Sequence, residues 1–232
     1  MSMIAPGTVA FDMIGTCFNL NKPKQRLVEL GLPTYALQLW FAQTLRDAFA
    51  LSHAGGYQPL NQMLEAELPR TLKLFNVEID PERQAHVLSA FNELELETGA
   101  LEAFQRLTEA GWRLVALTNG GIESTHNLLE KAGALPYFAD SVAWRPKGAI
   151  VRSCDEIQIT KPHQDVYQLL GQNASGEIWM IAAHAWDIAG AIRAGLKTAF
   201  ITSSEGSYLS AYPQPDVMAS GLIEAVNQIL GK

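Results

Sequence analysis

Cysteine is scarce in this sequence, with two residues, Cys17 and Cys154, among 232. Two cysteines cannot form the set of disulfides that holds small secreted domains together, and they are too few for a zinc site made of cysteine ligands. Cys17 lies in the segment TCF, after a predicted strand, and free cysteine is among the most frequently buried residue types. We therefore interpret Cys17 as a small buried core residue.

Positive charge is also in short supply. The formal net charge is −7 and the isoelectric point is about 5.2, without a cluster of basic residues, which argues against nucleic-acid binding. No apolar run approaches the roughly 20 residues that a membrane-spanning helix needs. The opening residues, MSMIAPGTVAFDM, lack the basic and apolar regions of a signal peptide. We expect a soluble, cytoplasmic protein that binds neither nucleic acid nor membrane.

Hydrophobic residues make up 48% of the chain, enough to bury a substantial core in one or two domains. Brief apolar runs predict buried strands, and longer helical patterns lie between them, several of which end at a glycine where a helix C-cap is expected. Strands that alternate with helices predict a doubly wound α/β domain with a parallel sheet. The predicted strands are Thr8 to Met13, Trp112 to Leu117, Ile178 to Ala183 and Lys197 to Ile201.

One region interrupts this alternation. Residues 22–98 show only helical periodicity, in segments such as YALQLWFAQTLRDAFALS, LNQMLEAELPRTLKLF and PERQAHVLSAFNELE. A helical block that follows the first strand predicts an inserted cap, so that residues 1–21 and 99–232 form the α/β core domain and residues 22–98 the helical cap domain. Pro69 lies inside the second of these segments and predicts a kink or a break in that helix.

Polar residues follow the ends of the predicted strands, where open α/β sheets bind their ligands. Taken singly, an aspartate after a strand, a Thr-Asn-Gly segment or a Lys-Pro pair is usually a cap or a turn. Together, they predict one site with a nucleophile, a cation, hydroxyl and amide donors and a second carboxylate. The residues are Asp12 and Thr16 after the first strand, Thr118 and Asn119 after the second, His184 and Asp187 after the third, and Lys161 ahead of a helix.

These segments resemble the four motifs of the haloacid dehalogenase superfamily, in the same order along the chain. FDMIGT resembles motif I with Asp12 as nucleophile, LTNG resembles motif II, Lys161 in KP matches motif III, and HAWD resembles motif IV with Asp187 as its acid. Within the superfamily, the pattern is most similar to that of the type II 2-haloacid dehalogenases. Their motif III continues KPxxxVY, which places Tyr167 on their active-site tyrosine. The helical block matches the position of the cap.

The residues near Asp12 bear on the choice between carbon–halogen and phosphate-ester chemistry. Phosphatases of this superfamily carry a second aspartate two residues after the nucleophile, which protonates the departing alkoxide, and usually an acid four residues before the one matched by Asp187, where Mg²⁺ is held. Here those positions are Ile14 and Ala183. A halide leaves without a proton, and a 2-haloacid carries one negative charge. We therefore predict hydrolysis of small 2-haloacids, or of another small carboxylate, with no metal and no cofactor.

The resemblance also implies a role for each residue. Asp12 would displace the halide from C2 and form an ester that water hydrolyses at the Asp12 carbonyl. Lys161 would keep Asp12 ionised, and Asp187 would orient Lys161 and help to activate the water. Thr16 is the fourth predicted catalytic residue. The predicted substrate-binding residues are Thr118 and Asn119, which would hold the substrate carboxylate or stabilise the oxyanion, with Tyr167, His184, Phe41 and Ile14.

Several positions depart from the family pattern. Ile14 stands where an aromatic residue is common, and Ala182 and His184 stand where motif IV commonly has serine and asparagine. His184 could activate water or donate to the leaving halide; the alternative is a histidine that packs beside Trp186. Phe41 aligns with an arginine of the family's cap and would give the pocket an apolar wall.

Two further features leave alternatives open. Arg46 lies five residues beyond Phe41 and faces about 140° away from it on a straight helix, so it either lines the pocket or pairs with an acid such as Asp47. An apparent insertion at residues 143–152 is interpreted as a solvated hairpin or loop, with a dimer contact as the alternative. A homodimer is thus compatible with the sequence.

Two competing functions also stay open. One is a hydrolase of the same superfamily that acts on another substrate, including a Mg²⁺-dependent phosphate-ester hydrolase. The other is a non-catalytic binding protein that keeps the fold. The presence of Asp12, Lys161 and Asp187 argues against the binding protein, whereas the changes at Phe41 and His184 keep it open.

Overall fold

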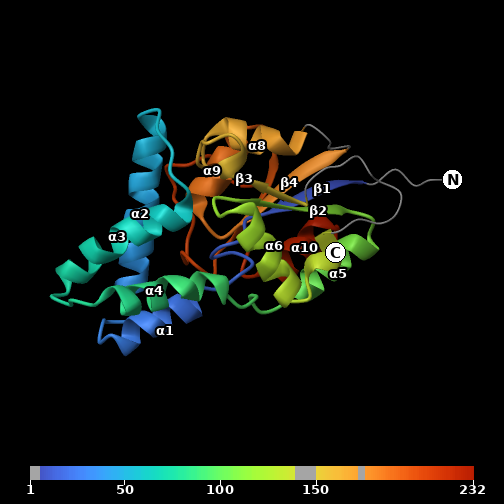
Figure 1. Cartoon of the computed structure of the whole chain (residues 1–232). Helices are drawn as coiled ribbons and strands as arrows, with labels where there is room; N and C mark the ends of the chain where they lie inside the picture. The colour runs from blue at the N-terminus through green and yellow to red at the C-terminus, as the bar shows by residue number, and fades with distance from the viewer. Residues whose placement is uncertain (1–5, 139–149, 172–175) are drawn as a thin grey trace.

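The computed structural model describes residues 6–138, 150–171 and 176–232. In these residues, a six-stranded parallel sheet has the order β3-β2-β1-β4-β5-β6 (Figure 1). The central strand β1 (Gly7–Phe11) pairs with β2 (Arg113–Thr118) on one side and with β4 (Glu177–Ala182) on the other. Buried apolar runs form strands here because helices cover both faces of the sheet. The other strands are β3 (Val151–Ser153), β5 (Lys197–Ile201) and β6 (Val217–Ala219).

The parallel sheet confirms the predicted doubly wound α/β fold, and each of the four predicted strands is present. Strands β3 and β6 are missing from the prediction because each has three residues, too few to give a recognisable apolar run. Val151 and Arg152 belong to β3, so the interpretation of residues 143–152 as a loop is wrong at its end. Residues 143–149 of that segment lie outside the described residues.

Helices cover the two faces of the sheet with separate apolar clusters. One cluster joins β1, β2 and β4 to α5, α6, α7 and α10, and the other joins the opposite face to α8 and α9. Figure 1 shows α5, α6 and α10 on one side of the sheet and α8 and α9 on the other. The bounds are α5 (Ala100–Glu109), α6 (Ile122–Lys131), α7 (Leu135–Phe138), α8 (Gln164–Gly171), α9 (Ala185–Arg193) and α10 (Leu222–Ile229), with the short 3₁₀ helix η2 at Cys154–Glu156.

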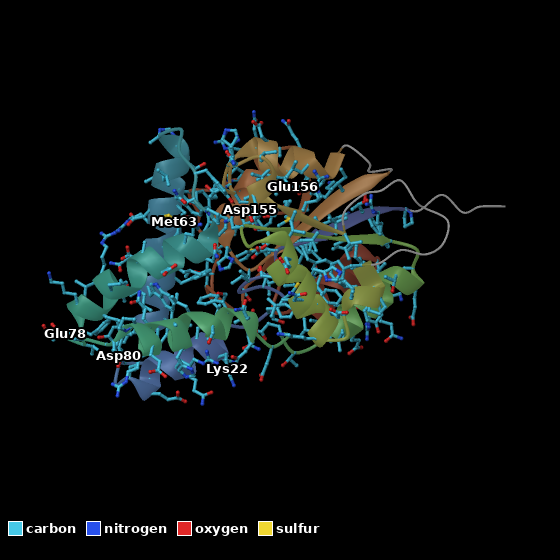
Figure 2. All side chains as sticks on the ribbon, viewed as in Figure 1. Lys22, Met63, Glu78, Asp80, Asp155 and Glu156 are labelled. Carbon is cyan, nitrogen blue, oxygen red and sulfur yellow. The ribbon has the colours of Figure 1, made fainter. Side chains whose placement is uncertain are left out.

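The helical block between β1 and α5 has an apolar cluster of its own, centred on side chains such as Trp40, Leu64 and Leu68. In Figure 1 it lies beside the sheet, and in Figure 2 Glu78 and Asp80 stand at its edge away from the sheet. Its elements are α1 (Asn21–Glu29), α2 (Ala36–His53), α3 (Leu60–Leu74), α4 (Pro81–Ser89) and the 3₁₀ helix η1 (Ala90–Asn92).

Helix α3 runs through Pro69 without a break, so that alternative is wrong, and the predicted kink stays a prediction. Leu64, Leu68 and Leu72 lie on one buried face of α3, and this packing offsets the backbone hydrogen bond that proline cannot make.

The chain enters and leaves the helical block through adjacent segments. Asn19 N donates to Glu95 O at 2.9 Å, and Glu97 N donates to Cys17 O at 2.7 Å. These bonds tie the two connections together close to the carboxyl end of β1. The domain boundaries at residues 21/22 and 98/99 stay a prediction.

Candidate active site

Asp12 directly follows β1 and lies at the carboxyl end of the central strand, 4% exposed. Its backbone N–H donates to Ile181 O at 3.0 Å, which continues the pairing with β4 by one residue. The two carboxylate oxygens have different partners. Oδ1 accepts from Lys161 Nζ at 2.8 Å. Oδ2 accepts from Thr16 Oγ1 at 2.8 Å and lies 3.2 Å from His184 Nδ1.

Lys161 is completely buried and connects the two carboxylates of the site. Its ammonium donates to Asp12 Oδ1 at 2.8 Å, to Asp187 Oδ2 at 2.6 Å and to Leu117 O at 3.0 Å. All three N–H donors are therefore used, as a buried ammonium requires. The sequence places Lys161 between β3 and α8, and only the fold brings it to the ends of β1 and β2.

Asp187 lies in the first turn of α9, where a negative charge is favoured by the helix dipole. The Tyr167 hydroxyl lies 2.6 Å from Asp187 Oδ1 and 2.9 Å from Asp187 O. Gly190 makes room for this hydroxyl, because a Cβ there would lie 2.5 Å from it. Tyr167 is fully buried and does not line the cavity beside Asp12. The fold places it behind Asp187, and its role in substrate binding stays a prediction.

The charges of this cluster shift the pKa values of its members. Burial would raise the pKa of Asp12, but the charge of Lys161 and the hydrogen bond and charge of His184 outweigh it and hold that pKa well below its usual range. Burial would lower the pKa of Lys161, yet Asp12 and Asp187 raise it above its ordinary value. Asp12 and Lys161 are therefore an ion pair at neutral pH.

Burial, joined by repulsion from Asp12, raises the pKa of Asp187 against the opposing charge of Lys161. Asp187 is therefore the more basic of the two carboxylates that share the ammonium.

His184 is the N-cap residue of α9, and its ring packs beside Trp186 as one of the predicted alternatives has it. Its ring stacks on Trp186 at a centroid distance of 5.4 Å and lies 6.3 Å from the ring of Phe41, as well as facing Asp12. Burial disfavours the charged imidazolium, but the hydrogen bond and charge of Asp12 outweigh burial and raise the His184 pKa. Packing beside Trp186 and contact with the nucleophile therefore occur together.

Thr118 and Asn119, at the end of β2, are both buried and oriented by fixed donors. Thr118 Oγ1 accepts from Gly120 N at 2.9 Å, and Asn119 Oδ1 accepts from Lys161 N at 2.9 Å and from Cys154 Sγ at 2.8 Å. Burial raises the pKa of Cys154 to about 12, so its thiol keeps the proton that it donates. Because these bonds engage the amide oxygen of Asn119, its NH₂ group stays available as a donor, and Asn119 lines the cavity beside Asp12.

A small cavity lies beside Asp12. Its free volume for water is about 10 Å³, which is room for about one molecule. Thr118, Asn119, Gly120 and His184 form its polar side with Asp12; Ile14, Phe41, Leu45, Leu60 and Trp186 form its largely apolar side.

The structure also places Arg46, whose side chain is exposed and pairs with Asp47 at 2.7 Å on the surface. It does not line this cavity. Leu45 and Leu60 are lining residues that the sequence prediction misses. Leu45 follows Phe41 by four residues and so shares its helix face, a spacing that could have identified it. Leu60, at the start of α3, is brought in by tertiary packing alone.

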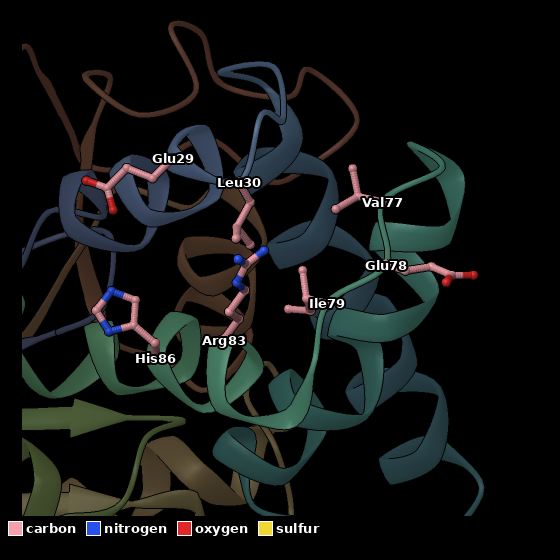
Figure 3. Close-up of a pocket in the computed structure, with 7 residues that line it drawn as sticks. All are labelled: Glu29, Leu30, Val77, Glu78, Ile79, Arg83 and His86. Carbon is pink, nitrogen blue, oxygen red and sulfur yellow. The ribbon is translucent and has the colours of Figure 1, made fainter.

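A second, more open hollow of about 410 Å³ lies between α1 and α4 (Figure 3). Its lining combines the apolar side chains of Leu30, Val77 and Ile79 with the polar or charged ones of Glu29, Glu78, Arg83 and His86. It contains none of the predicted site residues. The chemical groups gathered at Asp12 therefore identify the smaller cavity as the candidate active site.

Across residues 6–138, 150–171 and 176–232, no group of three or more histidine, cysteine, aspartate or glutamate side chains is arranged to hold a metal ion. The side chains of Ile14 and Ala183 offer no oxygen ligands beside Asp12. The donor set does not fit Mg²⁺, which prefers several oxygen ligands. Among the same residues, no helix has both the length and the apolar character needed to cross a membrane.

Comparison with known proteins gives concordant results. A family model for haloacid dehalogenase-like hydrolases matches residues 6–195. (S)-2-haloacid dehalogenase 4A of Burkholderia cepacia is 28% identical over 194 residues, which cover 81% of this chain and 79% of the relative. Haloacetate dehalogenase H-2 of Moraxella sp. (strain B) is 23% identical over 199 residues, covering 83% of this chain and 84% of the relative.

Solved structures show the same fold. L-2-haloacid dehalogenase from Xanthobacter autotrophicus, with chloropropionic acid covalently bound, superimposes with a TM-score of 0.83 at 20% identity. The match covers 98% of this chain and 99% of that one.

Proposed function

The chain belongs to the family of haloacid dehalogenase-like hydrolases, and we propose that it hydrolyses the carbon–halogen bond of small 2-haloacids through an ester on Asp12. The observation that carries this proposal is the environment of Asp12. It is an ionised carboxylate beside a small cavity, and no second carboxylate of the described residues lines that cavity. Such a site can release a halide, which is a weak base, more readily than an alkoxide, which needs a proton.

The names of the relatives support the same substrate class. One relative is an (S)-2-haloacid dehalogenase, and another is a haloacetate dehalogenase. The cavity beside Asp12 is small, and Phe41 and Ile14 narrow its apolar side. We therefore propose a haloacid with a short chain as the substrate. The predicted cap, residues 22–98, would contribute the wall that contacts this chain.

Each residue of the site then has a role. Asp12 attacks C2, and Lys161 keeps it ionised and in place through the ion pair. Asp187 orients Lys161 and is itself positioned by Tyr167. Thr118 and the NH₂ group of Asn119 hold the substrate carboxylate, because their other polar atoms are engaged by the protein.

A panel assay tests the proposed function. The purified protein is incubated with fluoro-, chloro- and bromo-acetate and with 2-halopropionates in the presence of EDTA, and halide release is recorded. A generic phosphate ester with Mg²⁺ is run in parallel. We expect halide release that EDTA does not affect. Phosphate release alone would contradict the proposal in favour of the second hydrolase, and silence in both assays from folded protein would favour a binding protein.

Two finer points stay predictions. A homodimer is tested by light scattering of the purified chain, and the predicted cytoplasmic location by fractionation of the cells that produce it.

A further inference from the structure

The two carboxylate oxygens of Asp12 have unequal hydrogen bonding. Thr16 Oγ1 accepts the backbone N–H of Ala183 at 2.9 Å, so the single proton of its hydroxyl is free to donate to Asp12 Oδ2. His184 Nδ1 lies 3.2 Å from the same oxygen. Asp12 Oδ1 has Lys161 as its only such partner among the described residues. Oδ1 therefore keeps a free lone pair, while both acceptor directions of Oδ2 are taken.

The His184 ring is held in this position by its neighbours. Trp186 stacks on the ring, and Phe41 contacts it from α2. Gly15 leaves room on another side, because a Cβ there would lie 2.8 Å from His184 Cε1. Nδ1 faces an ionised carboxylate oxygen and must carry a hydrogen, since two lone pairs would repel. Nδ1 is therefore a donor, aimed at Oδ2 before the reaction begins.

We propose that Thr16 and His184 form the oxyanion-binding pair of the second half-reaction, in which water hydrolyses the ester on Asp12. This inference rests on the proposed function. Asp12 Oδ1, with its free lone pair, becomes the ester oxygen. Asp12 Oδ2 becomes the carbonyl oxygen, which takes up the negative charge when water attacks.

With these two oxygens assigned, the bond changes of both steps are fixed. In the first step, a lone pair on Oδ1 forms the bond to C2 of the haloacid, and the carbon–halogen pair leaves with the halide. In the second step, water adds to the Asp12 carbonyl carbon, and the π pair moves onto Oδ2. That pair returns as the bond between the carbonyl carbon and Oδ1 breaks. One water proton ends on the 2-hydroxyacid, and the other passes to solvent as Asp12 returns to its carboxylate.

The two steps make opposite demands on the donors at Oδ2. During displacement, negative charge leaves Asp12, so donors at Oδ2 stabilise the reactant more than the transition state. During hydrolysis, negative charge returns to Oδ2, and the same donors stabilise the transition state in a buried site. His184 should therefore accelerate ester hydrolysis and have no accelerating effect on halide displacement.

Rapid-quench kinetics with 2-chloropropionate can separate the steps. His184→Phe keeps an aromatic ring between Phe41 and Trp186 but removes the donor, and His184→Asn keeps a short amide donor. The matched control is His86→Phe on the exposed face of α4, away from Asp12. The readouts are the halide burst, the steady-state rate, and the mass of the Asp12 peptide, which increases when the ester accumulates.

In His184→Phe we expect a burst of about one halide per active site followed by turnover slowed about 10²- to 10³-fold, with the ester trapped on Asp12. His184→Asn should recover part of the rate, and His86→Phe should behave as wild type. Equal loss of the burst and of turnover in folded His184→Phe would overturn the inference, and so would unchanged turnover. If His184→Phe does not fold, His184→Asn decides: a slower hydrolysis step with an unchanged burst supports the inference. Wild type that releases no halide from any haloacid would instead refute the proposed function.

Discussion

The two walls of the cavity beside Asp12 come from different parts of the chain and differ in chemistry. The α/β part supplies the charged and hydrogen-bonding groups, including Asp12, Asn119 and His184, as well as two apolar side chains. The helical block supplies the apolar side chains of Phe41, Leu45 and Leu60. Bonds between elements hold two side chains of the first wall, with Asp12 bound to Lys161 and Asn119 bound to the backbone of Lys161. We therefore expect the α/β wall to perform the reaction and the helical wall to select the substrate.

Among substitutions in the α/β wall, Asp12→Asn should reduce turnover most. An amide is a poor nucleophile and cannot form the ester, so turnover should fall by at least about 10⁴-fold. The comparison is with Asp47→Asn, which changes an acid on the surface of the helical block. Halide release by the two variants measures the effect. Activity in Asp12→Asn that stays near wild type would remove Asp12 from the mechanism.

Lys161→Met should reduce both activity and stability. It leaves the buried carboxylates of Asp12 and Asp187 without their shared cation, which typically costs about 3–5 kcal/mol. Urea unfolding at neutral pH gives the change in the free energy of unfolding. Lys197→Met is the matched control. Lys197 pairs with Asp216 at an exposed site, so its loss should change activity and the free energy of unfolding little. Equal losses of unfolding free energy in the two variants would show that the buried ion pair stabilises the fold no more than the exposed one.

Phe41→Leu tests whether the helical wall of the cavity selects the substrate. The smaller side chain should widen the cavity and raise the ratio of kcat/KM for 2-chlorobutanoate over chloroacetate roughly 10-fold. Phe75→Leu is the control, because Phe75 packs on Tyr35 in the same block and does not line the cavity. A change in rate that is equal for both substrates would assign Phe41 a role in the reaction itself and not in substrate selection.

The smallest expected effect is on the pH dependence of stability, to which His184 contributes. Its pKa is raised in the folded protein above the ordinary value of 6.5, so the folded state binds the proton more tightly than the unfolded chain. That stabilisation is complete below about pH 6.5 and is lost as the pH rises through the folded-state pKa. Melting curves of wild type and His184→Asn should therefore differ most at acidic pH and converge toward alkaline pH. A difference that grows with pH would contradict this.

Local sequence patterns were sufficient to predict much of this fold. The apolar runs predicted β1, β2, β4 and β5, because a strand covered on both faces leaves a continuous hydrophobic signal. The motifs that follow these strands also indicated which residues gather at the site. Asp12 and Asp187 belong to this group, and the fold brings both to Lys161.

The sequence by itself therefore determined the four longer strands, the helical block and the set of polar residues, since each depends on neighbours in the chain. Tertiary structure alone decided which atoms face each other. It placed Tyr167 behind Asp187, set Leu60 against the cavity and gave the two oxygens of Asp12 different partners. The physical reason is that contacts between residues far apart in the chain depend on the packing of whole elements, which leaves no periodic trace in the sequence.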